Sequence, residues 1–300
     1  MMIGIDIGGT KIAAISLSSE GNNLKTISTF VPKNYDQFLR ELITIVEQLR
    51  KKTGIKEKGI GISLAGNINP NGSIKRAINL PWLTCKPLKS DIKKLLHQED
   101  IYIANDANCF TASEAYDGAA AGSNVVFGVI LGTGVGGGLS INNRLITGIN
   151  SLSGEWGHIP FPQWKNTILP KIKCTCGEYG CIETFLSGRG LQKIYESLSG
   201  NLIDVPQIIE EYSSGEIIAK SALDTYHQRL AEALAMVVKL FDPDIIVLGG
   251  GLSQINSIYN NVPKKIQVLL AIDNLNTQIV KAKHGPASGV RGAARLIQTN

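Results

Sequence analysis

The sequence predicts an α/β protein built from two related lobes. Its 300 residues come close to the length at which a single hydrophobic core stops growing and chains divide. One unit occurs twice, in residues 2–31 and again in residues 124–148: a strand, a turn with glycine and threonine, a strand, a turn with asparagine, and a third strand. Patterns of helices and buried strands lie between the copies. A unit repeated once indicates two lobes rather than a solenoid.

The first copy and the segment after it predict strands and helices in alternation. The predicted strands cover residues 2–7, 11–17, 24–31, 58–64 and 101–104. A helix over about 37–52 has apolar residues at i, i+3 and i+4 spacing, with Asp36 as a possible N-cap and Gly54 as the stop. A second helix follows Asn105 and Asp106 and continues to about residue 121.

The second copy opens the other lobe. Its predicted strands cover 125–131 and 135–141, with a short strand after the turn at Asn142-Asn143. A long helix over about 220–240 ends before Pro243, which cannot continue it. An apolar strand then ends in three glycines, and a final helix covers about 288–298. We therefore expect one lobe from 1–121 and a larger one from 122–286, with helix 287–300 packing back on the first.

Composition and charge exclude several classes of protein. The chain is 43% hydrophobic and 18% charged, as in globular domains. A net charge of +5 without a run of like charges argues against nucleic acid or membrane partners and suits a small anionic ligand. The N-terminus lacks a signal-peptide pattern, and no stretch approaches a membrane span of about 20 apolar residues. We expect a cytoplasmic protein.

The glycine-rich segments exclude other nucleotide-binding folds. Gly132, Gly134 and Gly137 match a G-x-G-x-x-G pattern, but a strand pattern follows where a dinucleotide site needs a helix. A P-loop motif and the protein-kinase motifs are both absent from the sequence. Two glycine-rich hairpin loops, at 6–11 and 131–138, remain as candidates for binding phosphate.

Each hairpin loop offers backbone N–H groups and a threonine hydroxyl, at Thr10 and Thr133, that could hold phosphate. A single glycine-rich turn usually serves only to reverse the chain direction. Two copies that both contain threonine favour binding of a phosphate chain from both sides. Asp6 beside phosphates indicates an intervening Mg²⁺ ion, held through water. The predicted nucleotide-binding residues are Asp6, Gly8, Gly9, Thr10, Lys11, Gly132, Thr133, Gly134, Gly136, Gly249 and Gly250.

Three of the five cysteines lie within residues 174–181. In a reducing compartment such a cluster indicates metal ligands rather than disulfides. His158, Cys174, Cys176 and Cys181 would fill a tetrahedral Zn²⁺ site and leave no open position, so the metal would be structural. The alternative is that these are simply small buried residues. Cys85 and Cys109 lie outside the cluster.

Taken together, these motifs resemble those of ROK-family sugar kinases, within the actin–hexokinase superfamily of ATPases. The resemblance covers nearly the whole chain. It rests on IGIDIGGTKI at 3–12, ANDANC at 104–109, LGTGVGGG at 131–138, GEWGH at 154–158, CTCGEYGCIE at 174–183 and DPDIIVLGGG at 242–251. It implies ribonuclease-H-like lobes with ATP and a sugar in the interlobe cleft.

The resemblance also implies residue roles. Asp106 would be the general base that accepts the proton of the attacking sugar hydroxyl; the alternative for an Asp at this place is a helix N-cap. The implied sugar contacts are Asn79, Asn105, Glu155, His158 and Glu183. For Glu183 the alternative is a solvated helix start. His158 would bind the metal through one ring nitrogen and a sugar hydroxyl through the other.

The resemblance leaves the sugar open between two substrates. EAYDGAAAG, GEWGH and KAKHGPASGVRGAA look most like fructokinases that also accept mannose, which predicts phosphorylation of fructose at its 6-hydroxyl. CFTASEA and LSGRG are similar to N-acetylglucosamine kinases, the second prediction. A sugar-sensing regulator is a third reading, disfavoured because the first hairpin strand starts at Met2. The resemblance further suggests a homodimer.

Overall fold

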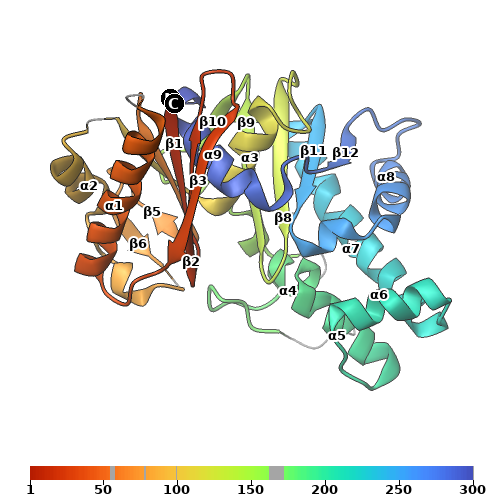
Figure 1. The fold of residues 1–300 in the computed structure, drawn as a ribbon. Helices are drawn as coiled ribbons and strands as arrows, with labels where there is room; N and C mark the ends of the chain where they lie inside the picture. Colours follow the sequence, from red (N-terminus) through yellow and green to blue (C-terminus); the bar gives the residue numbers. More distant parts are fainter. Residues whose placement is uncertain (55–57, 78, 99, 162–171, 300) are drawn as a thin grey trace. The chain divides into compact units, whose positions relative to one another are not determined.

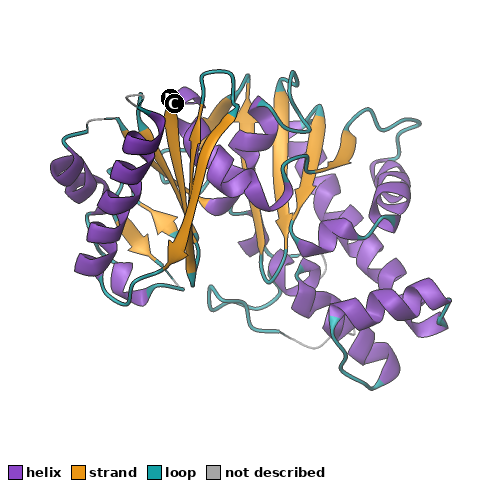
Figure 2. Cartoon of the chain, viewed as in Figure 1, coloured by secondary structure: helices purple, strands orange, loops and turns teal. Residues whose placement is uncertain are grey.

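The computed structural model describes residues 1–300 apart from 55–57, 78, 99, 162–171 and 300. Two five-stranded sheets organise the chain, with the orders β3-β2-β1-β4-β7 and β10-β9-β8-β11-β12 (Figures 1 and 2). In each sheet a hairpin-linked set of three strands comes first in the chain, and two strands parallel to its first strand follow. The two orders match strand for strand, which confirms the repeated unit predicted from the sequence.

The first sheet brings three parallel strand ends together. Its strands are β1 (Met2–Ile7), β2 (Lys11–Leu17), β3 (Asn23–Phe30), β4 (Ile60–Leu64) and β7 (Ile101–Asn105). Ile7 pairs with Leu64, and Leu64 pairs with Asn105. The carboxyl ends of β1, β4 and β7 therefore lie level at one edge, where ligands bind in α/β sheets. A small separate sheet pairs β5 (Asn67–Ile68) with β6 (Ile74–Arg76).

Side chains of β1 alternate between two helical layers. Ile3, Ile5 and Ile7 belong to the core that α1 (Tyr35–Thr53) and α2 (Leu88–Leu96) complete. Met2 belongs to the core on the opposite face, with side chains of α9 (Ser288–Thr299). Because successive strand residues point to opposite faces, Asp6 shares the α9 side.

Glycines allow α9 to approach the sheet and α3 (Asp106–Tyr116) closely. A side chain on Gly4 would collide with the backbone of Val290, and one on Gly61 with that of Ala293. Gly292 in α9 lies against the backbone of Cys109 in α3 in the same way. Glycine is therefore required at these positions for close packing and not for a turn.

The second sheet consists of β8 (Val125–Leu131), β9 (Val135–Ile141), β10 (Arg144–Ile146), β11 (Ile245–Gly249) and β12 (Gln278–Lys281). The helices that follow in the chain are α4 (Ile182–Leu186), α5 (Gly188–Ser199), α6 (Val205–Ser214), α7 (Ile217–Phe241) and α8 (Ser257–Leu270). The longest, α7, packs against α5 and α8 and ends at a left-handed Asp242 before Pro243, as predicted. Among the described residues, no helix is both long and apolar enough to span a bilayer.

The chain divides into two compact units. The first contains Met1–Asn124, Gly138–Ser153 and Ala282–Asn300, and the second contains Val125–Gly137 and Gly154–Lys281. The C-terminal helix α9 thus belongs to the first unit, where it packs on β1 and α3. The segment Gly138–Ser153, which includes most of β9 and all of β10, also belongs to that unit rather than to the second.

Two helix boundaries differ from the sequence predictions. The N-cap of α1 is Asn34, whose side chain accepts a hydrogen bond from the Gln37 amide, and not Asp36. Helix α3 ends at Tyr116 rather than near residue 121. It ends there because the amide of Ala119 turns back to the Glu114 carboxylate at 2.9 Å. Glu114 is fully buried and also accepts hydrogen bonds from the amides of Lys283 and His284.

Asp117, directly after α3, joins this helix to α9. Its carboxylate accepts hydrogen bonds from Arg291 at 2.8 Å and from Arg295, and His284 Nε2 lies 3.0 Å from it. Arg295 is completely buried and stacks over the ring of Tyr116. Burial alone would raise the pKa of Asp117, but hydrogen bonds from His284 and Arg295 and the charges of both arginines hold it well below its usual value.

We expect Asp117→Asn to lower the free energy of unfolding by about 3–5 kcal/mol, because Arg295 would remain buried without its counter-charge. The matched control is Asp224→Asn, which removes the exposed ion pair with Lys265 and should cost less than about 1 kcal/mol. Since the folded pKa of Asp117 is depressed, its stabilisation is present above pH ~4 and lost below it. Urea unfolding from pH 3 to pH 7 measures both effects; equal costs for the two variants would contradict the prediction.

Candidate functional site

In the first unit, two predicted site residues stand where β7 passes into α3. Asn105, the last residue of β7, is the N-cap of α3, and its side-chain oxygen accepts a hydrogen bond from the Asn108 amide at 2.7 Å. Asp106 is the first residue of the helix, is exposed, and accepts a hydrogen bond from the Ala107 amide. The capping role considered for Asp106 therefore belongs to Asn105.

Asp6 lies near the end of β1, two strands away from Asn105. Its carboxylate oxygens face Gly289 in the first turn of α9, where a Cβ would come within 3.2 Å of them. Burial raises the pKa of Asp6. A cation beside this carboxylate would favour its ionised form, so the residue suits the Mg²⁺ role predicted for it.

The first hairpin, between β1 and β2, is closed by a hydrogen bond from the Gly8 amide to the Lys11 carbonyl at 2.9 Å. Gly9, Thr10 and Lys11 are exposed at its tip. Gly9 lies against Asn79, whose Cβ would be 3.3 Å from a side chain at that position. One predicted nucleotide residue and one predicted sugar residue of this unit are thus neighbours.

In the second unit, the hairpin between β8 and β9 carries the remaining phosphate residues. The Gly132 amide donates to the Gly134 carbonyl at 3.0 Å, and Thr133 is exposed at the tip. Gly250 has φ +82°, and any side chain on it would collide with the Leu131 backbone at the end of β8. Close packing thus brings the Gly249-Gly250 segment to the base of this hairpin.

The GEWGH segment packs on β9. Trp156 donates from Nε1 to the Gly136 carbonyl at 3.0 Å and meets the Phe127 ring edge to face. A side chain on Gly157 would collide with the Val135 backbone. These contacts hold the short helix Trp156–His158 against the strand, and Glu155 precedes it.

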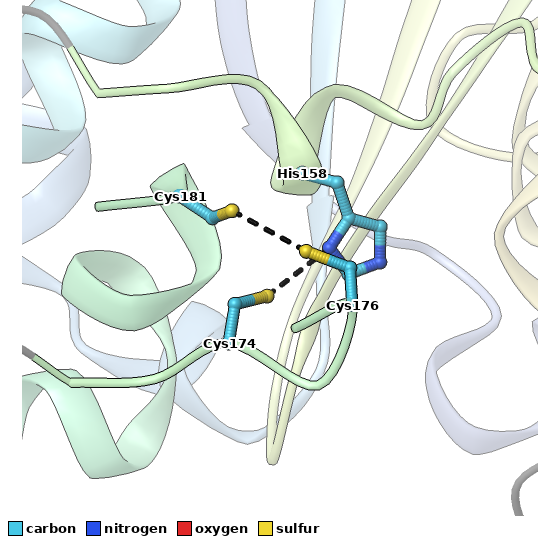
Figure 3. A group of neighbouring side chains, drawn as sticks. All are labelled: His158, Cys174, Cys176 and Cys181. Atoms are coloured by element: carbon cyan, nitrogen blue, oxygen red, sulfur yellow. Dashed lines mark hydrogen bonds between the residues drawn. The ribbon is translucent and has the colours of Figure 1, made fainter. Parts of the chain in front are cut away.

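The three cysteines and His158 converge (Figure 3). His158 Nδ1 and the sulfurs of Cys174, Cys176 and Cys181 all lie within 4.8 Å of one another. The Cys176 and Cys181 sulfurs are 3.6 Å apart, close to the ~3.8 Å that Zn–S bonds of about 2.3 Å impose on a tetrahedron. The thiolate and imidazole donors fit a structural zinc ion and leave no place for substrate on it.

His158 presents its two ring nitrogens to different partners. Nδ1 lies 3.3 Å from Cys174 Sγ, within the metal cluster. Nε2 points the other way, 3.9 Å from a carboxylate oxygen of Glu155. The ring could therefore offer one nitrogen to a metal and the other to a further ligand, and the role implied for His158 by the family resemblance stays a prediction.

Glu183 lies in the first turn of α4, two residues after Cys181 of the cysteine cluster. One carboxylate oxygen accepts a hydrogen bond from the Val135 amide at 3.0 Å, and the other accepts one from the Thr175 hydroxyl at 3.1 Å. The side chain is therefore not simply a solvated helix start. Oε2 keeps a further lone pair that another donor could use, whereas Oε1 also lies 3.6 Å from Cys174 Sγ.

Sequence reasoning missed the residues that hold these groups in place. The sequence indicates Trp156 only as part of the GEWGH motif, and it indicates no role for Val135 or Thr175. Val135 acts through its backbone amide, for which a sequence carries no signal. Thr175 stands between two cysteines, and this position is the signal in the sequence that could have indicated its role.

The comparisons with known proteins identify the family. The ROK family model matches residues 2–300. The chain belongs to the ROK family. An N-acetyl-D-glucosamine kinase of Pectobacterium carotovorum is 40% identical over 99% of this chain and 98% of its own.

Two solved structures share the fold. A ROK hexokinase of Thermus thermophilus has a TM-score of 0.87 at 25% identity, covering 99% of this chain and 97% of its own. A ROK glucokinase of Streptomyces griseus, in complex with glucose and AMPPNP, has a TM-score of 0.76 at 28% identity and covers 100% and 99%. This ROK protein accordingly has the two-lobed hexokinase-like fold that the resemblance implied, and it is a sugar kinase. The relative favours the second of the two predicted sugars.

Proposed function

We propose that this ROK protein transfers the γ-phosphoryl group of ATP to the 6-hydroxyl of N-acetylglucosamine. The observation that carries the choice of sugar is the 40% identity, over nearly the full length of both chains, to an N-acetyl-D-glucosamine kinase. The sequence segments that favoured fructose cover only short, separate parts of the chain. Fructose is therefore the second candidate.

Asp106 is the proposed general base. It is exposed at the start of α3, a helix capped by Asn105, and its carboxylate would accept the proton of the 6-hydroxyl as the oxygen attacks phosphorus. Proposed sugar contacts are Asn79 and Asn105 in the first unit and Glu155, His158 and Glu183 in the second. His158 Nε2 and the Glu155 carboxylate, 3.9 Å apart, form a donor and acceptor pair suited to neighbouring hydroxyls.

The nucleotide would be held by the two hairpins. Their backbone N–H groups and the hydroxyls of Thr10 and Thr133 are proposed to bind phosphate oxygens, with Lys11 adding positive charge. Asp6 is the proposed outer ligand of Mg²⁺, which neutralises phosphate charge when bound. The segment Gly249-Gly250 has no side chain to obstruct an adenosine. The cysteine cluster is proposed to hold Zn²⁺ and, through it, the position of His158.

A substrate panel tests the proposed sugar. We expect kcat/KM with N-acetylglucosamine to exceed that with fructose, mannose or glucose by at least about 10²-fold, because a site that hydrogen-bonds the acetamido group leaves those partners unpaired with the other sugars. N-acetylmannosamine in the panel tests the stereochemistry at the same carbon. An Asp106→Asn preparation serves as the control for contaminating kinases. Fructose as the best substrate would overturn this assignment in favour of the first sequence prediction.

A further inference from the structure

Glu183 bridges two segments of the second unit that carry different ligands in the proposed function. Its Oε2 accepts the hydrogen bond of the Val135 amide, at the foot of the hairpin that carries Thr133. Its Oε1 accepts the hydroxyl of Thr175, in the loop between two metal ligands. One carboxylate thus joins the predicted phosphate hairpin to the predicted metal loop.

The helix that carries Glu183 is firmly packed in the second unit. Glu183 belongs to α4, whose remaining side chains, from Ile182 through Leu186, are buried. The Ser187 amide donates to the Glu183 carbonyl at 3.1 Å, and the Gly188 amide donates to the Gly132 carbonyl at 2.8 Å. The end of this helix therefore contacts the hairpin through the backbone as well, on the other side of Thr133.

Gly134 leaves the space that the bridge needs. A Cβ at this position would lie 2.5 Å from Glu183 Oε2, closer than any stable contact. A glycine here therefore permits Glu183 Oε2 to accept the hydrogen bond from the amide of the next residue, Val135. The requirement is separate from any contact of Gly134 with phosphate.

Thr175 supplies the link on the metal side. Cys174 Sγ also lies 3.6 Å from Glu183 Oε1, but a zinc-bound thiolate has no proton to donate. With metal bound, the Thr175 hydroxyl keeps its hydrogen bond to the carboxylate. The orientation of Glu183 then depends on a loop that the metal orders.

We infer that Glu183 is a positioning residue that couples occupancy of the metal site to nucleotide binding at the β8–β9 hairpin. The inference rests on the proposed function for the identity of the two ligands. A coupling between two binding sites is reciprocal, so nucleotide must tighten zinc binding by the factor by which zinc tightens nucleotide binding. No sugar is needed for this effect, which separates it from a role of Glu183 in binding substrate.

The test measures the zinc affinity of the full-length protein by equilibrium competition with a colorimetric chelator, without sugar, in the presence and absence of Mg²⁺–AMPPNP. We expect saturating nucleotide to tighten zinc binding at least about five-fold. In Thr175→Val, which keeps the side-chain volume and removes the hydroxyl, this tightening should disappear although nucleotide still binds. Thr175→Ser, the matched control, should retain it.

Gly134→Ala perturbs the bridge from the hairpin side, and a preparation of this variant that still binds nucleotide should also lose the tightening. Calorimetric titration with nucleotide accompanies each measurement. If the wild-type protein binds nucleotide and zinc but has the same zinc affinity with and without nucleotide, the coupling is refuted while the proposed function stands. An undiminished effect in Thr175→Val refutes the path through Glu183. Failure of the wild-type protein to bind nucleotide at all refutes the proposed function together with the coupling.

Discussion

Asp106→Asn should reduce turnover by at least about two orders of magnitude while leaving the protein folded. General base catalysis typically contributes about 10²–10⁴-fold, and an amide cannot accept the proton. The substitution keeps the shape of the side chain. It also leaves the cap of α3 intact, because Asn105 and not Asp106 accepts the hydrogen bond from the Asn108 amide.

The measurement is kcat at saturating ATP and N-acetylglucosamine, with a thermal melt and a sugar-binding titration for the same preparation. Asn105→Ala is the contrasting variant. Removal of the cap should cost α3 about 1 kcal/mol of stability, whereas Asp106→Asn should leave the melting temperature almost unchanged. A folded Asp106→Asn enzyme with near wild-type kcat would exclude Asp106 as the base.

Cys176→Ser should remove the bound metal and weaken sugar binding. The purified wild-type protein is expected to carry about one zinc ion per chain, since the four donors fill a tetrahedral shell. Loss of one thiolate frees the loop and, with it, His158. Hydrogen bonds that involve charged groups contribute about 1.5–3 kcal/mol, so the loss of the His158 contact should weaken sugar binding by about 10–150-fold.

Cys85→Ser is the matched control, because Cys85 is an exposed thiol outside the cluster. It should leave both zinc content and sugar affinity unchanged. Elemental analysis and sugar titration of the two variants decide the matter. An active, stable wild-type preparation without zinc would show that the cysteines have another role.

The sequence by itself determined the elements whose patterns are strong and local. The alternating apolar residues of β1 and β2, the i, i+3, i+4 pattern of α1, and Pro243 after α7 each depend on a few neighbouring residues. The repeated unit predicted two related lobes, and the two five-stranded sheets share one strand order. The spacing of Cys174, Cys176 and Cys181 likewise predicted the cluster, since short loops bring such ligands together.

Helix ends depended on more than local sequence. Asn34 and Asp36 are both good caps, and so are Asn105 and Asp106. The choice between them is made by which residue has extended backbone angles, and in both helices this is the asparagine. The end of α3 depended on Glu114, whose buried carboxylate captures the Ala119 amide and amides about 170 positions later in the chain.

Only the tertiary structure decided why several glycines stand where they do and how the site is held. Gly4, Gly61 and Gly292 allow α9 to cross β1, β4 and α3, although nothing in the local pattern distinguishes them from flexible positions. The partners of Glu183 are a backbone amide 48 residues away and a threonine hydroxyl. Motifs indicate which side chains carry the chemistry, because that depends on residue type. Their mutual placement depends on contacts between distant segments, which form only when the chain has packed.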